Sequence, residues 1–468
     1  MKILVIGGGG REHAIVWALK KSARVTEVVC APGNGGIARE VRCVPIDPGD
    51  LDALVRLVQA EDPALTVVGP ELPLSLGLVD QLQRLGRRVF GPTQAAAQLE
   101  SSKSFSKSFM QRYGIPTAAY AICTSLDEVR GELKRFSAPI VVKADGLAAG
   151  KGVVICQSHH EAESAAAQMF SGVLLGTVET QIVLEEFLSG EELSFFALCD
   201  GTHAVPLAAA QDHKRIGECD TGPNTGGMGA YSTDTLMSRS MEAWLTTNVA
   251  QRVVDEMAGQ GTPFTGILFC GIMLVPDPDG PVLGTRGPVQ PMVLEFNTRF
   301  GDPETQAILM RLETDLLDLF EAAVDGTLGG TLGGTADHLA IRLKPGAAAC
   351  VVVASAGYPG KYPVGRPVFG LGLGLSEAAL SKGDPNLKVF HSGTALTPEG
   401  GLVTAGGRVL TITAVSTAGL EDALAHAYAA LDTISFEGMQ FRRDIGWRAL
   451  SSSHGDRLSP GKDERRQR

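Results

Sequence analysis

A short run near position 300 places side chains that bind cations beside side chains that bind anions. Residues 295–305 read Glu-Phe-Asn-Thr-Arg-Phe-Gly-Asp-Pro-Glu-Thr and follow the apolar segment 291–294. The segment is predicted to be a buried strand that ends in Glu295 and Asn297, whose oxygens share one face because strand positions two apart do so. A carboxylate and an amide oxygen suit a hard cation such as Mg²⁺, which completes its shell with water and substrate phosphates. The alternative is a strand end that surfaces into a polar loop.

A glycine run, Gly7–Gly10, lies between an expected strand at Lys2–Ile6 and an expected helix at Arg11–Lys20. A helix N-terminus at such a loop binds anions through free backbone N–H groups. The dinucleotide-binding fingerprint is not met, because its third glycine position falls on Glu12 or the next residue and the second strand ends in Ala31-Pro32 rather than in an acid. The loop is therefore predicted to bind a small phosphate-bearing ligand, with a tight turn and a nicotinamide site as the alternatives.

A second glycine-rich segment, residues 143–152, joins two expected strands at 140–143 and 153–156 and carries two lysines. It is not a P-loop, because Gly152 stands where that motif needs Ser or Thr. A glycine loop between strands can fold over a triphosphate as a flap, with backbone N–H groups and lysines on the phosphates. The alternative is a hairpin with solvated lysines.

Two further polar segments are candidates for ligand contacts. An apolar strand runs into four carboxylates within 183–192, which can bind a ribose and an adenine but also fits an ordinary strand-to-turn. Residues 211–215 (Gln-Asp-His-Lys-Arg) and the glycine-rich loop 220–232 are too polar to form a core and can wrap a polar substrate. His213 is a candidate general base, although a loop imidazole is more often a hydrogen-bonding or structural residue.

The composition and net charge of the chain exclude several classes of protein. The 468 residues are 44% apolar and 20% charged, which is typical of a globular protein with several domains. The net charge of −11 argues against a general nucleic-acid or membrane-surface binder. The eight cysteines show no C-x-x-C spacing, and neither a signal peptide nor a long unbroken apolar run is present. We therefore expect a cytoplasmic protein with reduced, mostly buried thiols.

The order of the expected elements divides the chain into α/β and α+β parts. Residues 1–102 alternate strands and helices, which predicts a parallel, Rossmann-like sheet. Residues 103–325 begin with a helix at 103–115 and include helices over Arg239–Met257 and Glu304–Val324. A glycine-rich linker at 326–335 leads to an α+β unit over 336–450, with strands at 338–343, 348–354, 388–390 and 408–415 and a helix at 420–431, and then to a tail at 451–468 that is expected to be disordered.

In this order, the motifs resemble those of the glycinamide ribonucleotide synthetases, a family of the ATP-grasp superfamily, over roughly residues 1–450. The segments that carry the resemblance are 9–14, 31–34, 68–71, 143–152, 211–215, 220–232, 295–304 and 443–448. Two features depart from the family pattern: Gly8 stands where a polar residue is frequent, and the Gly/Pro-rich stretch 277–290 is longer than expected.

The resemblance implies an ATP-grasp architecture with an N-terminal parallel-sheet domain, a nucleotide-covering lid at about 117–190 and a C-terminal α+β domain. It implies a carbon–nitrogen ligase of de novo purine biosynthesis that joins glycine to 5-phosphoribosylamine through a glycyl phosphate and releases ADP and phosphate. ATP and Mg²⁺, with Mn²⁺ as the alternative, would be the cofactors. The partners would be these small molecules, not nucleic acid or membrane, and the protein would be a monomer or weak dimer.

The resemblance also assigns residues to roles. Nucleotide contacts fall on Lys103, Lys143, Gly150, Lys151, Gly152, Glu185, Glu186, Leu188 and Glu192, and metal contacts on Glu295 and Asn297. Substrate contacts fall on Gly9, Glu71, Asp212, Lys214, Arg215, Asn224, Gly226, Gly227, Met228, Arg299 and Asp302, with Arg299 and Asp212 as the catalytic pair. The rivals are a carboxylase or formate-using transformylase of the same fold, a nicotinamide oxidoreductase, and a catalytically silent nucleotide-binding protein.

Overall fold

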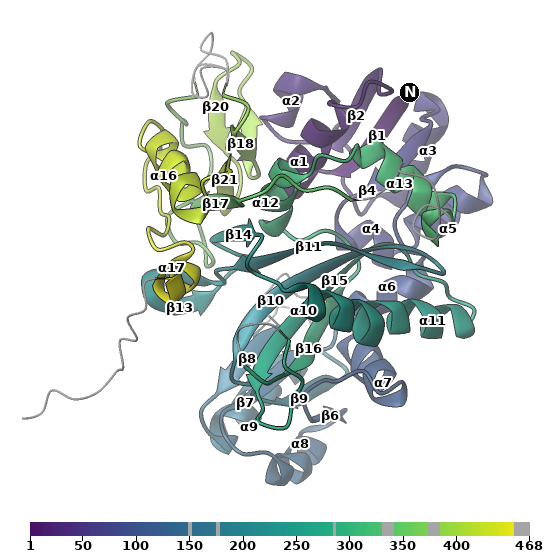
Figure 1. Cartoon of the computed structure of the whole chain (residues 1–468), viewed down its shortest axis with the longest axis vertical. Coiled ribbons are helices and arrows are strands. Elements are labelled where there is room, and N and C mark those ends of the chain that lie inside the picture. Colours follow the sequence, from purple (N-terminus) through teal and green to yellow (C-terminus); the bar gives the residue numbers. More distant parts are fainter. Residues whose placement is uncertain (148–151, 175–177, 284–286, 330–340, 372–383, 454–468) are drawn as a thin grey trace, which may run out of the picture.

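The structure is a computed structural model that describes residues 1–147, 152–174, 178–283, 287–329, 341–371 and 384–453 (Figure 1). Gly150 and Lys151, most of the expected linker and most of the expected tail lie outside these ranges. Within them, no helix combines the length and the apolar character that crossing a bilayer requires.

The N-terminal part is a five-stranded parallel sheet in the order β3-β2-β1-β4-β5. Side chains of its central strand alternate between two cores: Ile3 and Val5 pack with α1, whereas Leu4 and Ile6 pack with α3 and α5. The prediction of a parallel sheet flanked by helices is therefore confirmed. The elements are β1 Lys2–Gly7, α1 Gly10–Leu19, β2 Glu27–Pro32, α2 Ile37–Glu40, β3 Arg42–Cys43, α3 Leu51–Glu61, β4 Leu65–Val68, α4 Glu71–Ser75, α5 Leu78–Arg84 and β5 Val89–Phe90.

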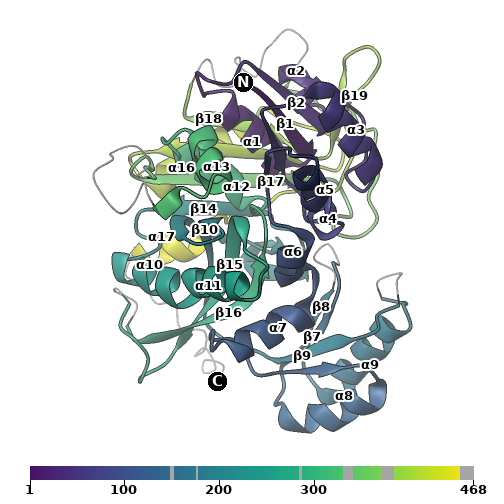
Figure 2. The ribbon, with the colours of Figure 1, turned by 90° about the vertical axis from the view of Figure 1, so that its right-hand side faces the viewer.

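A small subdomain follows and lies at the lower end of the molecule in Figures 1 and 2. It is a four-stranded antiparallel sheet in the order β6-β9-β7-β8. Residues of β7 such as Ile140 and Val142 pack against Ala162 and Ala166 of α9, which gives the subdomain a core of its own. Its elements and the helices before it are α6 Gln94–Ser101, α7 Lys103–Arg112, β6 Tyr120–Cys123, α8 Leu126–Glu132, β7 Ile140–Ala144, β8 Val153–Cys156, α9 His159–Phe170 and β9 Ile182–Glu186.

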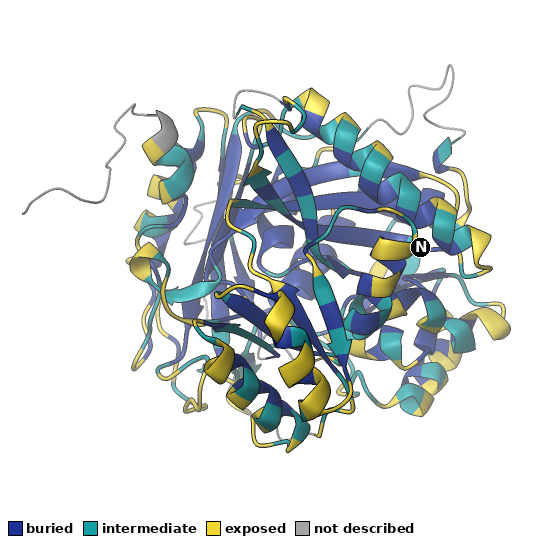
Figure 3. Cartoon of the chain, turned by 90° about the horizontal axis from the view of Figure 1, so that it is seen from below, coloured by how far each residue is buried: buried dark blue, intermediate teal, exposed yellow. Residues whose placement is uncertain are grey.

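An eight-stranded antiparallel sheet forms the centre of the molecule, in the order β16-β15-β10-β11-β14-β17-β21-β18. Phe195 and Phe196, adjacent on β10, enter two different cores, so both faces of this sheet are buried (Figure 3). The central elements are β10 Glu191–Asp200, β11 Ala204–Asp212, β12 Arg215–Gly217, β13 Thr221–Asn224, β14 Gly229–Thr233, α10 Arg239–Leu245, α11 Gln251–Gly259, β15 Thr265–Pro276 and β16 Val289–Asn297.

The C-terminal strands continue this same sheet, because β14 pairs with β17 between Gly229↔Val351 and Thr233↔Ala347. The α+β unit expected at the C-terminus therefore shares its sheet with the preceding part of the chain. Its elements are β17 Ala347–Ala354, β18 Leu387–His391, β19 Thr394–Leu396, β20 Leu402–Thr404, β21 Arg408–Ser416, α16 Leu420–Leu431 and α17 Trp447–Ser453.

Two expected elements differ in the structure. The single helix predicted over Glu304–Val324 is wrong: α12 (Glu304–Arg311) and α13 (Leu316–Val324) are separate, because Leu312 is extended and Asp315 caps the second helix by accepting from the Leu317 N–H. The strand predicted at 338–343 begins outside the described residues, and its described end forms only one isolated bridge, Leu312↔Leu343.

Candidate active site

Glu295 and Asn297 end β16 and lie on one face of it, opposite Gly271 and Phe269 of β15. A bulge at Leu294 precedes them, where the register between the two strands shifts by one residue. The Oδ1 atom of Asn297 accepts a hydrogen bond of 3.1 Å from Arg299, which fixes the orientation of the amide. The two oxygen donors predicted from the sequence are thus next to each other at the end of a strand.

Four cations from four different segments surround Glu295. Burial by itself would raise the pKa of this carboxyl, but Lys214, Lys143, Lys103 and Arg299 together hold the pKa below its ordinary value. Glu295 is therefore ionised at neutral pH and stands among four cations. Such an environment suits a ligand with several negative charges, as a triphosphate has.

The donor set around Glu295 fits a magnesium ion better than a softer metal. Within the described ranges, no group of three or more His, Cys, Asp or Glu side chains could hold a metal by itself. Glu295 and Asn297 offer oxygen only, and Mg²⁺ is typically bound through one or two carboxylates together with substrate phosphates and water. A metal here would depend on the nucleotide for its remaining ligands.

Lys143 at the end of β7 is held beside this strand end. Its Nζ atom lies 2.9 Å from Glu185 Oε1 and donates to the Leu294 carbonyl at 3.3 Å. The other oxygen of Glu185 lies 2.9 Å from the Nζ atom of Lys107, a residue of α7 that the sequence did not single out. A lysine within a polar helix resembles a solvated one, and only its tertiary contacts distinguish it.

The two ends of the expected flap are close together. The Ala144 N–H donates to the Gly152 carbonyl at 2.8 Å, and Lys103 Nζ donates to the Gly146 carbonyl at 3.1 Å. Asp145 fixes the first end by accepting from the Ser104 N–H at 2.6 Å. The flap residues Gly150 and Lys151 lie outside the described residues, so the loop between these ends is not described.

The remaining predicted nucleotide residues lie between the end of β9 and the start of β10. Glu186 is exposed and Leu188 is half-buried, whereas Glu192 on β10 forms an ion pair with Lys214. Asp212, at the end of β11, is a second carboxylate that acts on Lys214. Burial raises the pKa of Asp212 to about 8, although Lys214 acts in the opposite direction.

Arg299 joins the end of β16, with its candidate metal ligands, to Glu71 and Glu100 near the N-terminal sheet. Its Nη2 atom lies 2.7 Å from Glu100, its Nε atom lies 3.3 Å from Glu71, and its Nη1 atom donates to the Phe300 carbonyl at 3.1 Å. Burial would raise the pKa of Glu71, but Arg299 and then Arg11 lower it to about 2. Glu100, in α6, is a further site residue that the sequence did not reveal.

Asp302 meets the glycine loop and the C-terminal sheet. Its Oδ2 atom accepts from the Arg11 N–H at 3.4 Å, next to Gly9, whose own N–H donates to Glu12 at 2.6 Å. Arg408 of β21 donates to the Asp302 carbonyl at 2.5 Å and to the Gly226 carbonyl at 2.7 Å. Arg408 was also missed, because only the shared sheet brings β21 to this position.

The loop after β13 supplies the other predicted substrate residues. Gly227 has a φ of +109°, and a Cβ atom there would lie 2.5 Å from Pro303 Cδ, so only glycine fits between the two loops. Arg215 pairs with Asn224 in the β12–β13 hairpin and donates to the Gly222 carbonyl at 2.6 Å. Met228 is fully buried, and both its backbone N–H and its carbonyl are bonded within the protein, so it supports the loop rather than offering a group to a substrate.

His213 is a structural residue. Its ring is fully buried, and its Nε2 atom accepts from the Gly446 N–H at 2.8 Å. Burial, with the nearby Arg448 and Arg442, lowers the pKa of the imidazole to about 3. A ring that is already bonded and resists protonation connects the chain near Asp212 to the C-terminal segment instead of acting as a base.

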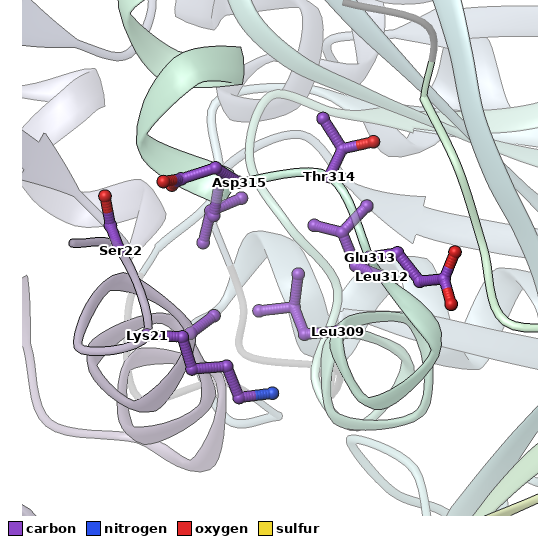
Figure 4. Close-up of a pocket in the computed structure, with 9 residues that line it drawn as sticks. Lys21, Ser22, Leu309, Leu312, Glu313, Thr314 and Asp315 are labelled. Carbon is purple, nitrogen blue, oxygen red and sulfur yellow. The ribbon is translucent and has the colours of Figure 1, made fainter. Parts of the chain in front are cut away.

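A small cavity between the end of α1 and the link from α12 to α13 lies apart from these residues (Figure 4). The residues that line it include Lys21, Leu309, Glu313, Thr314 and Asp315. None of the predicted site residues does so, and the cavity is not part of the candidate active site.

Solved structures with low sequence identity define the class of fold. The biotin carboxylase domain of Hydrogenobacter thermophilus 2-oxoglutarate carboxylase, in complex with MgADP, ADP and bicarbonate, is 16% identical and superposes with a TM-score of 0.67 over 94% of this chain and 91% of that one. The Campylobacter jejuni biotin carboxylase is 13% identical, with a TM-score of 0.68 over 96% and 95%. These similarities concern the fold alone, and the matched ATP-grasp family model at residues 101–305 places the chain in the ATP-grasp class.

Family models and relatives of higher sequence identity show which ATP-grasp family the chain belongs to. The models of the phosphoribosylglycinamide synthetase N domain, ATP-grasp (A) domain and C domain match residues 1–100, 101–305 and 348–448. A phosphoribosylamine–glycine ligase of Xanthomonas campestris is 49% identical over 96% of this chain and 98% of its own, and the crystal structure of one from Thermotoga maritima is 33% identical, with a TM-score of 0.77 over 95% and 100%. The chain belongs to the phosphoribosylglycinamide synthetase family.

Proposed function

We propose that this protein is a phosphoribosylamine–glycine ligase of de novo purine biosynthesis. It joins glycine to 5-phosphoribosylamine and converts ATP to ADP and phosphate, through a glycyl phosphate. The observation that carries the proposal is the position of Glu295 and Asn297 at a strand end where Lys103, Lys143, Lys214 and Arg299 converge. The names of its full-length relatives supply the identity of the acid and the amine.

The chemistry follows from the poor reactivity of a carboxylate toward an amine. Transfer of a phosphoryl group to the glycine carboxylate creates a leaving group, and this transfer needs positioning and charge neutralisation rather than covalent help from the protein. Lys143 and Lys103 hold the phosphates, and Lys214 neutralises the transferred group. Mg²⁺, held by Glu295 and Asn297, would withdraw charge from the phosphate oxygens and align them.

The substrate side has complementary roles. Arg299 orients the acyl phosphate, while Glu71, Asp302 and the Gly226–Gly227 loop position the phosphoribosylamine. Asp212, whose pKa is raised to about 8 by burial, is suited to exchange a proton with the amine near neutral pH. The adenine and ribose of ATP contact four residues at the end of β9 and the start of β10: Glu185, Glu186, Leu188 and Glu192.

The proposal also includes Mg²⁺ rather than Mn²⁺ as the metal that supports activity. The protein is proposed to be a monomer or weak dimer in the cytoplasm and not to bind nucleic acid. The net charge of −11 supports the last of these.

The proposal is tested by phosphate release from Mg-ATP, measured with purified protein. Release should require both glycine and 5-phosphoribosylamine, and the product should contain glycine nitrogen. ADP formation with bicarbonate or formate, and none with glycine, would assign the protein to another branch of the same fold. Replacing Mg²⁺ by Mn²⁺ in the same assay identifies the preferred metal.

A further inference from the structure

Two buried lysines share one carboxylate at the junction between the small subdomain and β16. Little of each side chain is exposed: 3% for Lys107, 8% for Lys143 and 2% for Glu185. Each ammonium lies 2.9 Å from a different oxygen of Glu185. The group therefore carries two positive charges and one negative charge in a place from which water is largely excluded.

Lys107 is anchored on the side away from Lys143. Its Nζ atom donates to Thr117 Oγ1 at 2.7 Å, and this hydroxyl donates to the Val293 carbonyl at 2.6 Å. Lys143 donates to the next carbonyl of the same strand, that of Leu294. The three charged side chains thus form a fixed bridge from α7 through β9 and β7 to the strand that ends in Glu295.

The number of ammonium groups that share the Glu185 carboxylate decides how much positive charge Lys143 can present to a ligand. With Lys107 in place, Glu185 divides its charge between two ammonium groups, and Lys143 retains net positive charge for a second anion. Without Lys107, Glu185 and Lys143 would form a neutral buried pair, because one negative charge would then face a single positive charge and a buried charge is costly unless it is compensated. Burial lowers the pKa of Lys107 to about 8, against the effect of Glu185, so its ammonium is still charged at neutral pH.

We propose that Lys107 is a positioning residue for ATP: it occupies one oxygen of Glu185 and so leaves the ammonium of Lys143 available to the nucleotide phosphates. Lys107 does not touch the nucleotide itself. This inference rests on the proposed function only in taking ATP as the ligand, and it does not depend on which acid and amine are joined.

The test is Lys107→Met, which removes the charge and keeps the length of the side chain. The KM and Kd for Mg-ATP should rise about 10-fold to 100-fold, which is the size of losing one hydrogen bond from a charged group, here that of Lys143 to a phosphate. The KM for glycine should stay within twofold. Lys107→Arg should restore most of the ATP affinity. The matched control is Lys134→Met, an exposed lysine of the same subdomain, which should leave both constants unchanged.

The same substitution in a Glu185→Gln background separates positioning from direct contact. If Lys107 acts through Glu185, Lys107→Met should change the Kd for ATP less than threefold once the carboxylate is gone. A tenfold change in that background, or an unchanged Kd in the wild-type background, overturns the proposal. Should Lys107→Met fail to fold alone, the double variant compared with Glu185→Gln still decides: a change in Kd of less than threefold supports the proposal, and a tenfold change overturns it.

Direct measurement of ATP binding also separates this inference from the proposed function. Wild-type protein that binds Mg-ATP but releases no phosphate with glycine would refute the ligase activity and leave the role of Lys107 to be decided by the Kd values.

Discussion

Replacing Arg299 by lysine tests whether the shape of its guanidinium group, and not its charge alone, organises the active site. Arg299 makes four contacts: with Glu100 at 2.7 Å, with Asn297 at 3.1 Å, with Glu71 at 3.3 Å and with the Phe300 carbonyl at 3.1 Å. These partners surround a planar fork of donors, and a single ammonium on a shorter chain can reach about half of them.

The expected loss follows from the contacts that lysine gives up. A hydrogen bond that involves a charged group contributes about 1.5–3 kcal/mol. Two such losses, which are not fully additive because Glu71 and Glu100 share one network, amount to roughly 2–4 kcal/mol, or about 30-fold to 1000-fold in kcat/KM. Burial raises the pKa of Glu100, so the loss of its close partner should favour the protonated form of this carboxyl.

The assay is steady-state phosphate release with saturating Mg-ATP and varied glycine and 5-phosphoribosylamine. The surface substitution Arg366→Lys, at a half-exposed arginine paired with Glu437, is the matched control and should be neutral. If Arg299→Lys reduced kcat/KM less than threefold, the geometry of the fork would be irrelevant, and the role assigned to Arg299 would be wrong.

Three further predictions concern the charges around the same centre. Lys143→Ala should lower turnover about 10²-fold to 10³-fold, as for the loss of one preorganised charge-stabilising donor, and a loss under threefold in the phosphate assay would contradict its phosphate role. Glu295→Gln should raise the Mg²⁺ concentration for half-maximal activity by more than about tenfold, on the scale of losing even a supporting contact to a metal, and an unchanged titration would exclude it as a ligand. Asp212→Asn should lower activity yet stabilise the free protein: the pKa of Asp212 is raised in the folded state, which destabilises the ionised form, so wild-type stability should fall as the pH rises from about 4 to 8. The gain in melting temperature of this variant should therefore be larger at pH 8 than at pH 5, and an equal gain at both would refute the shift.

The placement of Glu295 and Asn297, the candidate metal ligands, on one face at a strand end could be predicted from the sequence because it is local geometry. Glu295 and Asn297 are two residues apart on one strand, and the face they share depends only on strand periodicity. The parallel sheet of residues 1–102 was predictable for a similar reason, since alternating strands and helices leave few other arrangements. The break between α12 and α13 was not predicted, although Asp315 is a recognisable helix cap, because the apolar pattern continues through it.

The residues that the sequence did not reveal act through contacts far apart in the chain. None of the three stands in a motif: Lys107 and Glu100 lie in helices, and Arg408 begins a strand. Their partners are Glu185, Arg299 and Asp302, each 78 or more positions away by residue number. Only the folded arrangement distinguishes such residues from solvated ones, which is why the sequence did not point to these supporting contacts of the candidate site.

The C-terminal segment helps to hold several of the candidate substrate residues in place. Arg442 is fully buried and bonds to Asp220 at 2.9 Å, to Asp444 at 2.8 Å and to the Arg215 carbonyl at 3.1 Å. Arg448 donates to the Asp212 carbonyl at 3.3 Å. Because one buried guanidinium ties the start of β12 and the β12–β13 connection to the chain near position 444, the position of Asp212 depends on residues more than two hundred positions later. The shared sheet has the same effect through Arg408, so the candidate active site and the C-terminal part of the chain should lose their structure together rather than in separate steps.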